Sequence, residues 1–321
     1  MLPTGSLVSL GRSFLLALGL VVLGCQSPQD NPPPPENLPD PEQLIPSAAA
    51  VSAAKQRVSE RPYESKVPDS YHAGKNWPLV VLLHGYGANG LGQDLYFGLG
   101  KEVERLGFLY AYPDGTLDSK GKRFWNATDV CCDFDKKGID DVAYVDAIID
   151  DMASRYRVDK RRVFLVGHSN GGFMSHRYAC DRSERIAAIV PLAGDMYKNT
   201  ALCKPTKPVA VLQVHGDKDD AVPYEGGTEP QTGRSLPSAL DSVKFWAGVG
   251  GCAATATAVP PNLDVDMNIA GEETKVDRFL NCQPGGAAEL WTIQGGAHLP
   301  ALGRPNWANQ VWGFLSAHPK P

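Results

Sequence analysis

Short, continuous apolar runs alternate with helical patterns along most of this chain, and this alternation constrains the fold more than any other sequence feature. The run 79–83 is bounded by Pro78 and by His84, so it predicts a strand buried on both faces. Residues 140–156 instead repeat apolar side chains at helical spacing behind an acidic first turn. Strands that alternate with helices predict an α/β fold in a single domain, with a mostly parallel sheet covered on both faces. Further strands are expected at 107–112, 163–166, 186–190, 209–214 and 290–293, and further helices at 171–180, 238–248 and 307–317.

The N-terminal segment has a different composition. Arg12 precedes a continuous apolar run over 14–23, which is followed by Gly24 and Cys25. A basic flank, a short apolar core and small residues at the expected cleavage site predict a secretory signal peptide over 1–24. The apolar run is too short to span a bilayer as a permanent helix. The segment also resembles a bacterial lipoprotein signal, whose final cysteine becomes lipidated. The alternative is an ordinary signal peptide beside an unrelated cysteine.

The residues that follow Cys25 predict a tether. From Gln26 to about Pro46 the sequence is polar and proline-rich, without the apolar periodicity needed to bury surface. We therefore divide the chain into a signal peptide (1–24), a lipidated cysteine with its tether (25–59) and a folded domain (60–321). The predicted location is the cell envelope or extracellular surface, with the membrane contacted only through the lipid. The formal charge of -5 gives no electrostatic case for a nucleic-acid partner.

Export also determines how the cysteines are interpreted. An even number in an exported chain predicts up to three disulfides. We expect Cys252 to pair with Cys282 and the other four to pair among themselves. A bond between the adjacent Cys131 and Cys132 would strain the backbone, so we do not expect that pair. Zinc is disfavoured, because the chain has no CxxC pair and no neighbouring histidines. Apart from Cys25, the cysteines are Cys131, Cys132, Cys180, Cys203, Cys252 and Cys282.

A G-x-S-x-G motif lies between the predicted strand 163–166 and the predicted helix 171–180. The pentapeptide alone is common, but this position makes it specific. A sharp strand-to-helix turn needs little bulk at Gly167 and Gly171, and it exposes the hydroxyl of Ser169 at the edge of the sheet. The helix N-terminus behind the serine also favours developing negative charge. Ser169 is therefore the candidate nucleophile.

A serine nucleophile needs a base that is held by a third group. In the α/β-hydrolases, which carry this motif at a strand-to-helix turn, the order along the chain is serine, acid, histidine. His298 follows the strand 290–293 and is the candidate base. Three carboxylates follow the strand 209–214, where sites in such sheets lie, and each could orient the histidine. His84 and His215 precede glycines at strand ends and are expected to be structural, and His318 is expected in a solvated tail. The three carboxylates are Asp217, Asp219 and Asp220.

Acyl transfer also requires donors for an oxyanion. The backbone N–H of Asn170, directly after the nucleophile, is one candidate. The second is expected from the loop after the strand 79–83, and there we choose Tyr86 N–H, with Gly85 or Gly87 as alternatives.

Several segments occur in the order found in one enzyme family. From residue 60 to 317 the chain resembles the polyhydroxybutyrate depolymerase family of esterases, which includes feruloyl and acetylxylan esterases. This resemblance implies an α/β-hydrolase fold, a secreted serine esterase and a triad of Ser169, Asp219 and His298. The spacing HGxxDxxVPY selects Asp219 among the three carboxylates. The matching segments are LLHGYG at 82–87, YPDG at 112–115, DDV at 140–142, DKRRV at 159–163, GHSNGG at 167–172 and HGxxDxxVPY at 215–224.

The chain departs from the family beside the base. Family members commonly carry a tryptophan and a glycine around the proline after the histidine, but here the residues are Leu299, Pro300 and Ala301. Loss of that aromatic side chain weakens the case for binding polymers or aryl groups, but not the case for hydrolysis itself. Trp125 matches a family aromatic residue near the pocket, so we expect it and Tyr224 to contact substrate. For Trp125, the alternative is an exposed loop residue that covers Cys131 and Cys132.

Three functional hypotheses follow. The first is a serine esterase without metal or organic cofactor that acts on short-chain, aryl (feruloyl or acetyl) or polyhydroxyalkanoate esters. The second is a peptidase, because the same fold and triad hydrolyse amides; the chain shows no acidic cluster placed to hold a peptide amine. The third is a surface-tethered binding protein with an inactive site. The serine, acid and histidine in the expected order argue against it.

Overall fold

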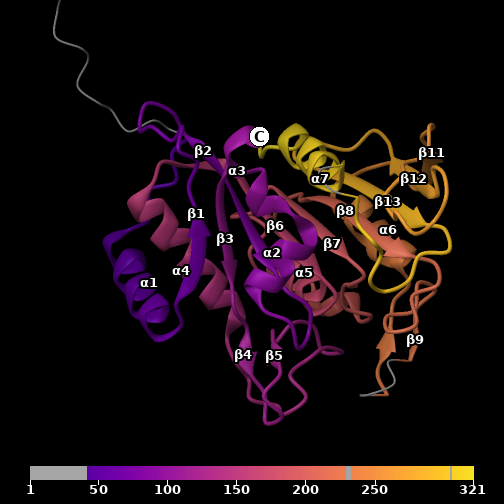
Figure 1. Ribbon diagram of the computed structural model, residues 1–321, viewed down its shortest axis with the longest axis horizontal. Helices are drawn as coiled ribbons and strands as arrows, with labels where there is room; N and C mark the ends of the chain where they lie inside the picture. Colours follow the sequence, from indigo (N-terminus) through magenta and orange to yellow (C-terminus); the bar gives the residue numbers. More distant parts are fainter. Residues whose placement is uncertain (1–41, 229–232, 304–305) are drawn as a thin grey trace, which may run out of the picture. The chain divides into compact units, whose positions relative to one another are not determined.

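The central sheet of the computed structural model has nine strands, in the order β1-β3-β2-β6-β7-β8-β13-β12-β11 (Figure 1). The structure describes residues 42–228, 233–303 and 306–321. The strands are β1 (Tyr63–Lys66), β2 (Trp77–Leu83), β3 (Leu109–Pro113), β6 (Val158–His168), β7 (Ala188–Leu192), β8 (Ala210–Gly216), β11 (Ala256–Ala258), β12 (Thr274–Phe279) and β13 (Ala287–Ile293).

The middle of the sheet is parallel, and its two margins are antiparallel. Strands β3, β2, β6, β7, β8 and β13 run parallel to one another, whereas β1, β12 and β11 pair antiparallel at the margins. Every residue of β2, β7 and β8 is buried, as expected for strands covered on both faces. In contrast, β12 alternates buried and more exposed residues. The predicted mostly parallel α/β sheet is confirmed.

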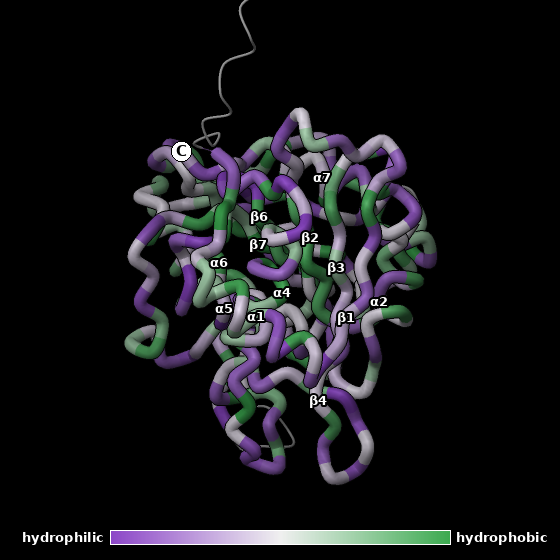
Figure 2. The backbone as a smooth tube through the Cα atoms, turned by 90° about the vertical axis from the view of Figure 1, so that its left-hand side faces the viewer, coloured by the Kyte–Doolittle hydropathy of each residue, from purple (hydrophilic) through white to green (hydrophobic). Residues whose placement is uncertain are grey.

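Helices cover both faces of this sheet. Residues of α4, α5 and α6 belong to the apolar cluster on one face, and residues of α2, α3 and α7 belong to the cluster on the other. Figure 2 shows hydrophobic segments along β2, β3, β6 and β7 in the interior, with hydrophilic loops around them. The helices are α1 (Ala48–Glu60), α2 (Gly90–Phe97), α3 (Val103–Leu106), α4 (Asp141–Arg155), α5 (Asn170–Asp181), α6 (Ala239–Val249) and α7 (Asn306–Ala317), with short 3₁₀ turns at η1 (Leu99–Lys101) and η2 (Thr200–Leu202).

The parallel strands end together at one edge of the sheet. Leu83 at the end of β2 pairs with Gly167 in β6, and Ile293 at the end of β13 pairs with Gly216 of β8. Two small hairpins extend from this side, at the lower edge of Figure 1: β4 (Thr116–Leu117) with β5 (Arg123–Phe124), and β9 (Gly227–Thr228) with β10 (Ser235–Leu236). The loops that leave the strand ends here carry the candidate site residues.

The folded part begins earlier than residue 60. The main chain of Glu42 and Leu44 is hydrogen-bonded to Lys160 and Val158, respectively, and α1 packs against α4 with Ala54 buried. The predicted boundary is therefore wrong, because the alanine-rich α1 has too few large apolar residues for its helical face to be visible in the sequence. Cys25 and the predicted signal peptide lie outside the described residues. Within the described ranges, no helix is long and apolar enough to cross a membrane.

Three disulfides join cysteines within the described residues. Cys252 is bonded to Cys282, which is the expected pair, and Cys180 is bonded to Cys203. The third bond joins the adjacent Cys131 and Cys132, so our expectation that these two would not pair is wrong. The peptide bond between them is cis, and their Cα atoms lie 3.1 Å apart.

Candidate active site

Ser169 lies at a sharp turn between β6 and α5. Its backbone angles are φ 51° and ψ -119°, a conformation that non-glycine residues rarely adopt. A Cβ atom at Gly167 would lie 2.2 Å from the oxygen of Gly171, and one at Gly171 would lie 2.1 Å from the oxygen of Leu83. Both motif positions therefore require glycine. The turn leaves Ser169 partly exposed at the strand-end edge of the sheet.

The candidate base and acid lie in contact beside this turn. His298, in the loop after β13, donates from Nδ1 to Asp219 Oδ2 at 2.8 Å. The other carboxylate oxygen of Asp219 accepts the backbone N–H groups of Ala221 and Val222 at 2.9 and 2.8 Å. Burial would raise the pKa of Asp219, but hydrogen bonds from His215 and His298 outweigh burial and hold that pKa well below its usual range. Asp219 is thus ionised at neutral pH, and Nε2 of His298 is left as the proton acceptor.

The two neighbouring carboxylates have other positions. Asp217 accepts the backbone N–H of Gly295 at 2.7 Å and so braces the turn before His298. Asp220 is exposed. Of the three candidates, the structure brings Asp219 to the histidine, and the catalytic assignment itself remains a prediction.

The small cavity in front of the serine brings the candidate nucleophile and base together. Its volume is about 190 Å³. Among the described residues no direct hydrogen bond joins Ser169 Oγ to the ring of His298, but both side chains line this cavity. Its other lining residues are Tyr86, Cys131, Cys132, Phe134, Phe173, Ala221 and Val222.

Two backbone N–H groups near Ser169 are unused. Within the described part of the chain, the N–H groups of Tyr86 and Asn170 donate no hydrogen bond. By contrast, Gly85 N–H donates to Gln93 Oε1 at 3.2 Å, and Gly87 N–H donates to the oxygen of Arg123 at 2.8 Å. A Cβ atom built on Gly85 would lie 3.4 Å from that of Ser169, so this loop adjoins the serine. The geometry favours Tyr86 over the two glycines as an oxyanion donor.

Trp125 does not contact the cavity. Its side chain is fully buried and its indole N–H donates to the oxygen of His84 at 2.9 Å. Its backbone N–H and oxygen bind the side-chain amide of Asn170, at 2.7 and 2.9 Å. The expected substrate contact and the exposed-loop alternative are both wrong, because neighbours distant in sequence, including Tyr144, bury this ring. Trp125 instead holds Asn170 in place.

Tyr224 and the histidines His84 and His318 also make contacts within the fold. Tyr224 bonds Thr292 through its hydroxyl at 2.7 Å and packs against His215, outside the lining of the small cavity, and its expected substrate contact stays a prediction. His84 Nε2 accepts the backbone N–H of Gly115 at 2.8 Å, as a structural role requires. His318 is bound to the oxygen of Phe314 at 2.7 Å, so it does not lie in a free tail.

Phe134 and Phe173 line the cavity, although neither was expected there from the sequence. Phe173 lies four residues after Ser169 on α5, and that spacing is a usable signal, because residues four apart share a helix face. The position of Phe134 depends on the fold of a long loop and had no such signal. Phe134 packs against Tyr86 at 5.3 Å between ring centroids, and both rings also line a larger polar cleft.

A second buried carboxylate lies behind Asp219. The side chains of Asp195 and His215 are fully buried, with Asp195 Oδ1 3.7 Å from His215 Nδ1. His215 Nε2 lies 3.3 Å from Asp219 Oδ2 and 2.8 Å from the oxygen of Val222. Burial raises the pKa of Asp195 to about 7, with Asp219 adding to the rise and His215 opposing it. The described residues contain no group of three or more histidine, cysteine or acidic side chains that could hold a metal ion.

The raised pKa of Asp195 predicts a pH-dependent cost in stability. In the unfolded chain this carboxyl loses its proton above about pH 4, whereas in the folded chain it keeps the proton until about pH 7, so stability falls as the pH rises between these values. Asp195→Asn removes this cost. The free energy of unfolding of Asp195→Asn minus that of the unsubstituted protein should therefore be about 2–3 kcal/mol larger at pH 8 than at pH 5. Urea unfolding at both pH values measures the difference.

Asp264→Asn is the matched control, because Asp264 is exposed and its substitution should cause no such change. A difference between Asp195→Asn and the unsubstituted protein that does not vary with pH would contradict the assignment.

With this geometry established, similarity to known proteins identifies the family. The family model described as phospholipase/carboxylesterase matches residues 71–232, about half of the chain. The chain belongs to the phospholipase/carboxylesterase family. The matched part contains Tyr86, Ser169 and Asp219, whereas His298 lies beyond it. The expected α/β-hydrolase fold and the resemblance to an esterase family are confirmed.

Individual relatives of this carboxylesterase-family chain agree with that assignment. Feruloyl esterase B from Piromyces equi is 28% identical over 248 residues, which cover 75% of this chain but only 43% of that protein. The putative esterase NocK from Nocardia uniformis subsp. tsuyamanensis is 25% identical over 324 residues, covering 91% and 90% of the two chains. The solved acetyl xylan esterase from Aspergillus awamori has a TM-score of 0.54 at 18% identity, covering 78% of this chain and 93% of that one. At that identity the likeness shows the fold.

Proposed function

We propose that this chain is a serine hydrolase of carboxylic esters that works through an acyl-enzyme. The observation that carries the proposal is the 2.8 Å hydrogen bond between Asp219 and His298 beside the cavity that both His298 and Ser169 line. A carboxylate bound to Nδ1 fixes the tautomer that can accept the serine proton at Nε2. Membership of the phospholipase/carboxylesterase family supports the same chemistry.

In this mechanism Ser169 Oγ attacks the ester carbonyl and transfers its proton to His298 Nε2. The N–H groups of Tyr86 and Asn170 hold the oxyanion, and His298 then protonates the leaving alcohol. Water, activated by the same histidine, releases the acid and restores Ser169. Asp219 stabilises the imidazolium that forms in both steps.

We further propose that the acyl part is short or aromatic. The cavity in front of Ser169 is small, at about 190 Å³, and Phe134 and Phe173 supply aromatic surface to its lining. Two relatives of this chain are named feruloyl esterase and acetylxylan esterase. Their names refer to an aromatic and a short acyl group, respectively. The exposed Leu299 after His298 offers no aromatic ring for a polymer chain.

A panel assay tests this substrate preference. p-Nitrophenyl acetate, p-nitrophenyl butyrate and methyl ferulate should be hydrolysed with kcat/KM at least about tenfold above that for esters of long fatty acids, because acyl groups that outgrow the cavity lose transition-state contacts. Monomer release from polyhydroxybutyrate film should be slower than release from these soluble esters. Faster turnover of the film than of the short esters would contradict the proposal.

For localisation, we propose export with a lipid on Cys25, as the apolar run at 14–23 and the residues after it suggest. One acyl chain gives marginal membrane binding, so stable attachment requires the several chains of a bacterial lipoprotein.

A further inference from the structure

Basic side chains gather at the edge of the sheet where the parallel strands begin, although the chain as a whole has a formal charge of -5. They flank the starts of β2, β6 and β8 and the C-terminal residues after α7. We call this surface the basic edge. It consists of Lys75, Arg157, Lys160, Arg161, Arg162, Lys204, Lys207 and Lys320.

Hydrogen bonds show that the basic edge is one continuous surface. Arg162 donates to the backbone oxygen of Asn76 at 3.1 Å, and Arg161 donates to that of Lys320 at 2.7 Å. Lys320 Nζ in turn donates to the oxygen of Pro208 at 3.2 Å, next to Lys207. A cavity of about 290 Å³ at this surface is lined by Leu44, Lys160, Arg161, Glu184, Arg185, Lys320 and Pro321.

Much of the positive charge at this edge is not neutralised. Lys160, Lys204 and Lys207 are exposed, and within the described residues none of them forms an ion pair. Two acidic residues nearby are already used, because Glu42 pairs with Arg161 at 2.5 Å and Asp159 pairs with Arg162 at 2.6 Å. Glu184, which lines the cavity at this surface, is one opposing charge against these three exposed lysines.

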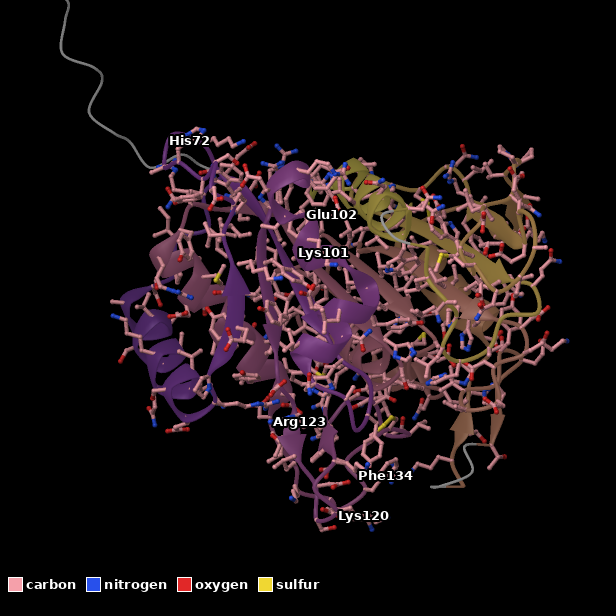
Figure 3. All side chains as sticks on the ribbon, in the orientation of Figure 1. His72, Lys101, Glu102, Lys120, Arg123 and Phe134 are labelled. Carbon is pink, nitrogen blue, oxygen red and sulfur yellow. A yellow bond between two sulfur atoms is a disulfide. The ribbon has the colours of Figure 1, made fainter. Side chains whose placement is uncertain are left out.

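The opposite edge carries charges of both signs. The polar cleft beside the candidate active site is lined by Asp118, Asp129, Asp133 and Asp135 and also by Lys120, Lys136 and Arg234. Strand β6 joins the two edges, since it begins at Val158, between Arg157 and Lys160, and ends at His168, next to Ser169. Eleven residues in a strand span about 35 Å. Figure 3 shows Phe134 and Lys120 at the lower edge and His72, near Lys75 in sequence, at the upper edge.

The chain also enters the folded domain at the basic edge. Glu42 O accepts the N–H of Lys160 at 2.9 Å, and Leu44 N–H donates to the oxygen of Val158 at 2.8 Å. The segment that leads back to Cys25 is therefore attached at the start of β6, on the side away from Ser169.

We propose that the basic edge docks on a membrane surface of anionic lipid head groups, with the candidate active site facing away from the lipid. Lysine and arginine side chains close to such a surface are attracted to it, and the attraction falls off within a Debye length. The attachment of the segment that leads back to Cys25 at this same edge favours the same orientation. Docking in this orientation leaves the cavity of Ser169 open to substrate in solution. The proposal does not depend on ester hydrolysis.

Vesicle sedimentation tests this contact without the lipid anchor. Every described helix and strand lies between Glu42 and Pro321, so a chain that begins at Gln26 keeps all of them and lacks only the predicted signal peptide and Cys25. This chain should bind vesicles of phosphatidylcholine with about one-third phosphatidylglycerol at low salt, and should bind pure phosphatidylcholine at least about tenfold more weakly. Raising the salt to about 0.5 M should abolish binding, because the Debye length shrinks to a few ångströms.

Charge reversal then locates the contact. The triple variant Lys160→Glu/Lys204→Glu/Lys207→Glu should bind phosphatidylglycerol vesicles at least about 100-fold more weakly, since each lysine is expected to supply about a fivefold increase in binding and each glutamate adds repulsion. The control Lys101→Glu/Lys244→Glu/Lys275→Glu replaces three exposed lysines away from the basic edge and changes the net charge equally, and it should lose less than about fivefold. Esterase activity on a soluble ester verifies that both variants are folded.

Three results would overturn the proposal. The first is equal binding to neutral and anionic vesicles, and the second is an equal loss in the control variant. The third is retention on a soluble polyanion such as DNA without binding to phosphatidylglycerol vesicles, which would assign the basic edge to a different kind of partner.

Discussion

Ser169→Ala should lower kcat/KM for ester hydrolysis by about 10⁵-fold while leaving the fold unchanged. The hydroxyl is the proposed nucleophile, so its removal eliminates the acyl-enzyme route altogether. The fold should persist, because Ser169 Oγ makes no hydrogen bond within the described residues and the substitution keeps a Cβ atom at the strained turn. Steady-state kinetics on p-nitrophenyl acetate, together with circular dichroism, measures both effects.

The matched control is Ser175→Ala, which removes a hydroxyl from the same helix. Ser175 is buried and donates to the oxygen of Gly171 at 2.8 Å, so this variant should lose some stability while its folded fraction keeps full activity. A fluorophosphonate probe should label the unsubstituted protein and Ser175→Ala but not Ser169→Ala. A folded Ser169→Ala protein with full activity would exclude the serine mechanism.

Asp219→Asn should lower turnover about 10³- to 10⁴-fold near neutral pH. The amide cannot stabilise the imidazolium of His298, and it can hold the ring in the wrong tautomer by donating to Nδ1. The loss should appear in kcat more than in KM, because the carboxylate acts in the transition state rather than on bound substrate.

Substitutions of the two neighbouring aspartates act as controls for the assignment of Asp219 as the acid. Asp217→Asn keeps the oxygen that accepts Gly295 N–H, and Asp220 is exposed, so both asparagine variants should stay within about tenfold of the unsubstituted protein. If Asp220→Asn instead shows the large loss of turnover, the acid is one residue further along the chain and the assignment of Asp219 is wrong.

The central strands and the candidate triad could be predicted because their signals are local. A strand buried on both faces is a continuous apolar run, and β2 and β8 show this plainly. Ser169, Asp219 and His298 each follow such a run, so their common edge was implied by the parallel sheet. Marginal elements gave weaker signals: β12 is only partly buried, and in α1 only Ala54 is buried.

The environment of individual side chains was harder to predict, because it depends on partners distant in sequence. Trp125 is buried by His84 and Tyr144, and Arg61 lies 5.0 Å from the centre of its ring; nothing beside Trp125 in the sequence indicates these contacts. Asp195 could not be distinguished from a surface aspartate until the fold placed it against His215.

The long loop between β5 and α4 has a consequence for how this enzyme class can diversify. Its residues Cys131, Cys132 and Phe134 form part of the cavity wall, while the proposed nucleophile, base and acid come from other loops. The loop is fixed at its base, where Asn126 N–H and Arg61 both bind the carboxylate of Asp141. Selection or engineering can therefore exchange residues 128–138 to alter which acyl group is accepted, while the positions of Ser169, His298 and Asp219 relative to one another are unchanged.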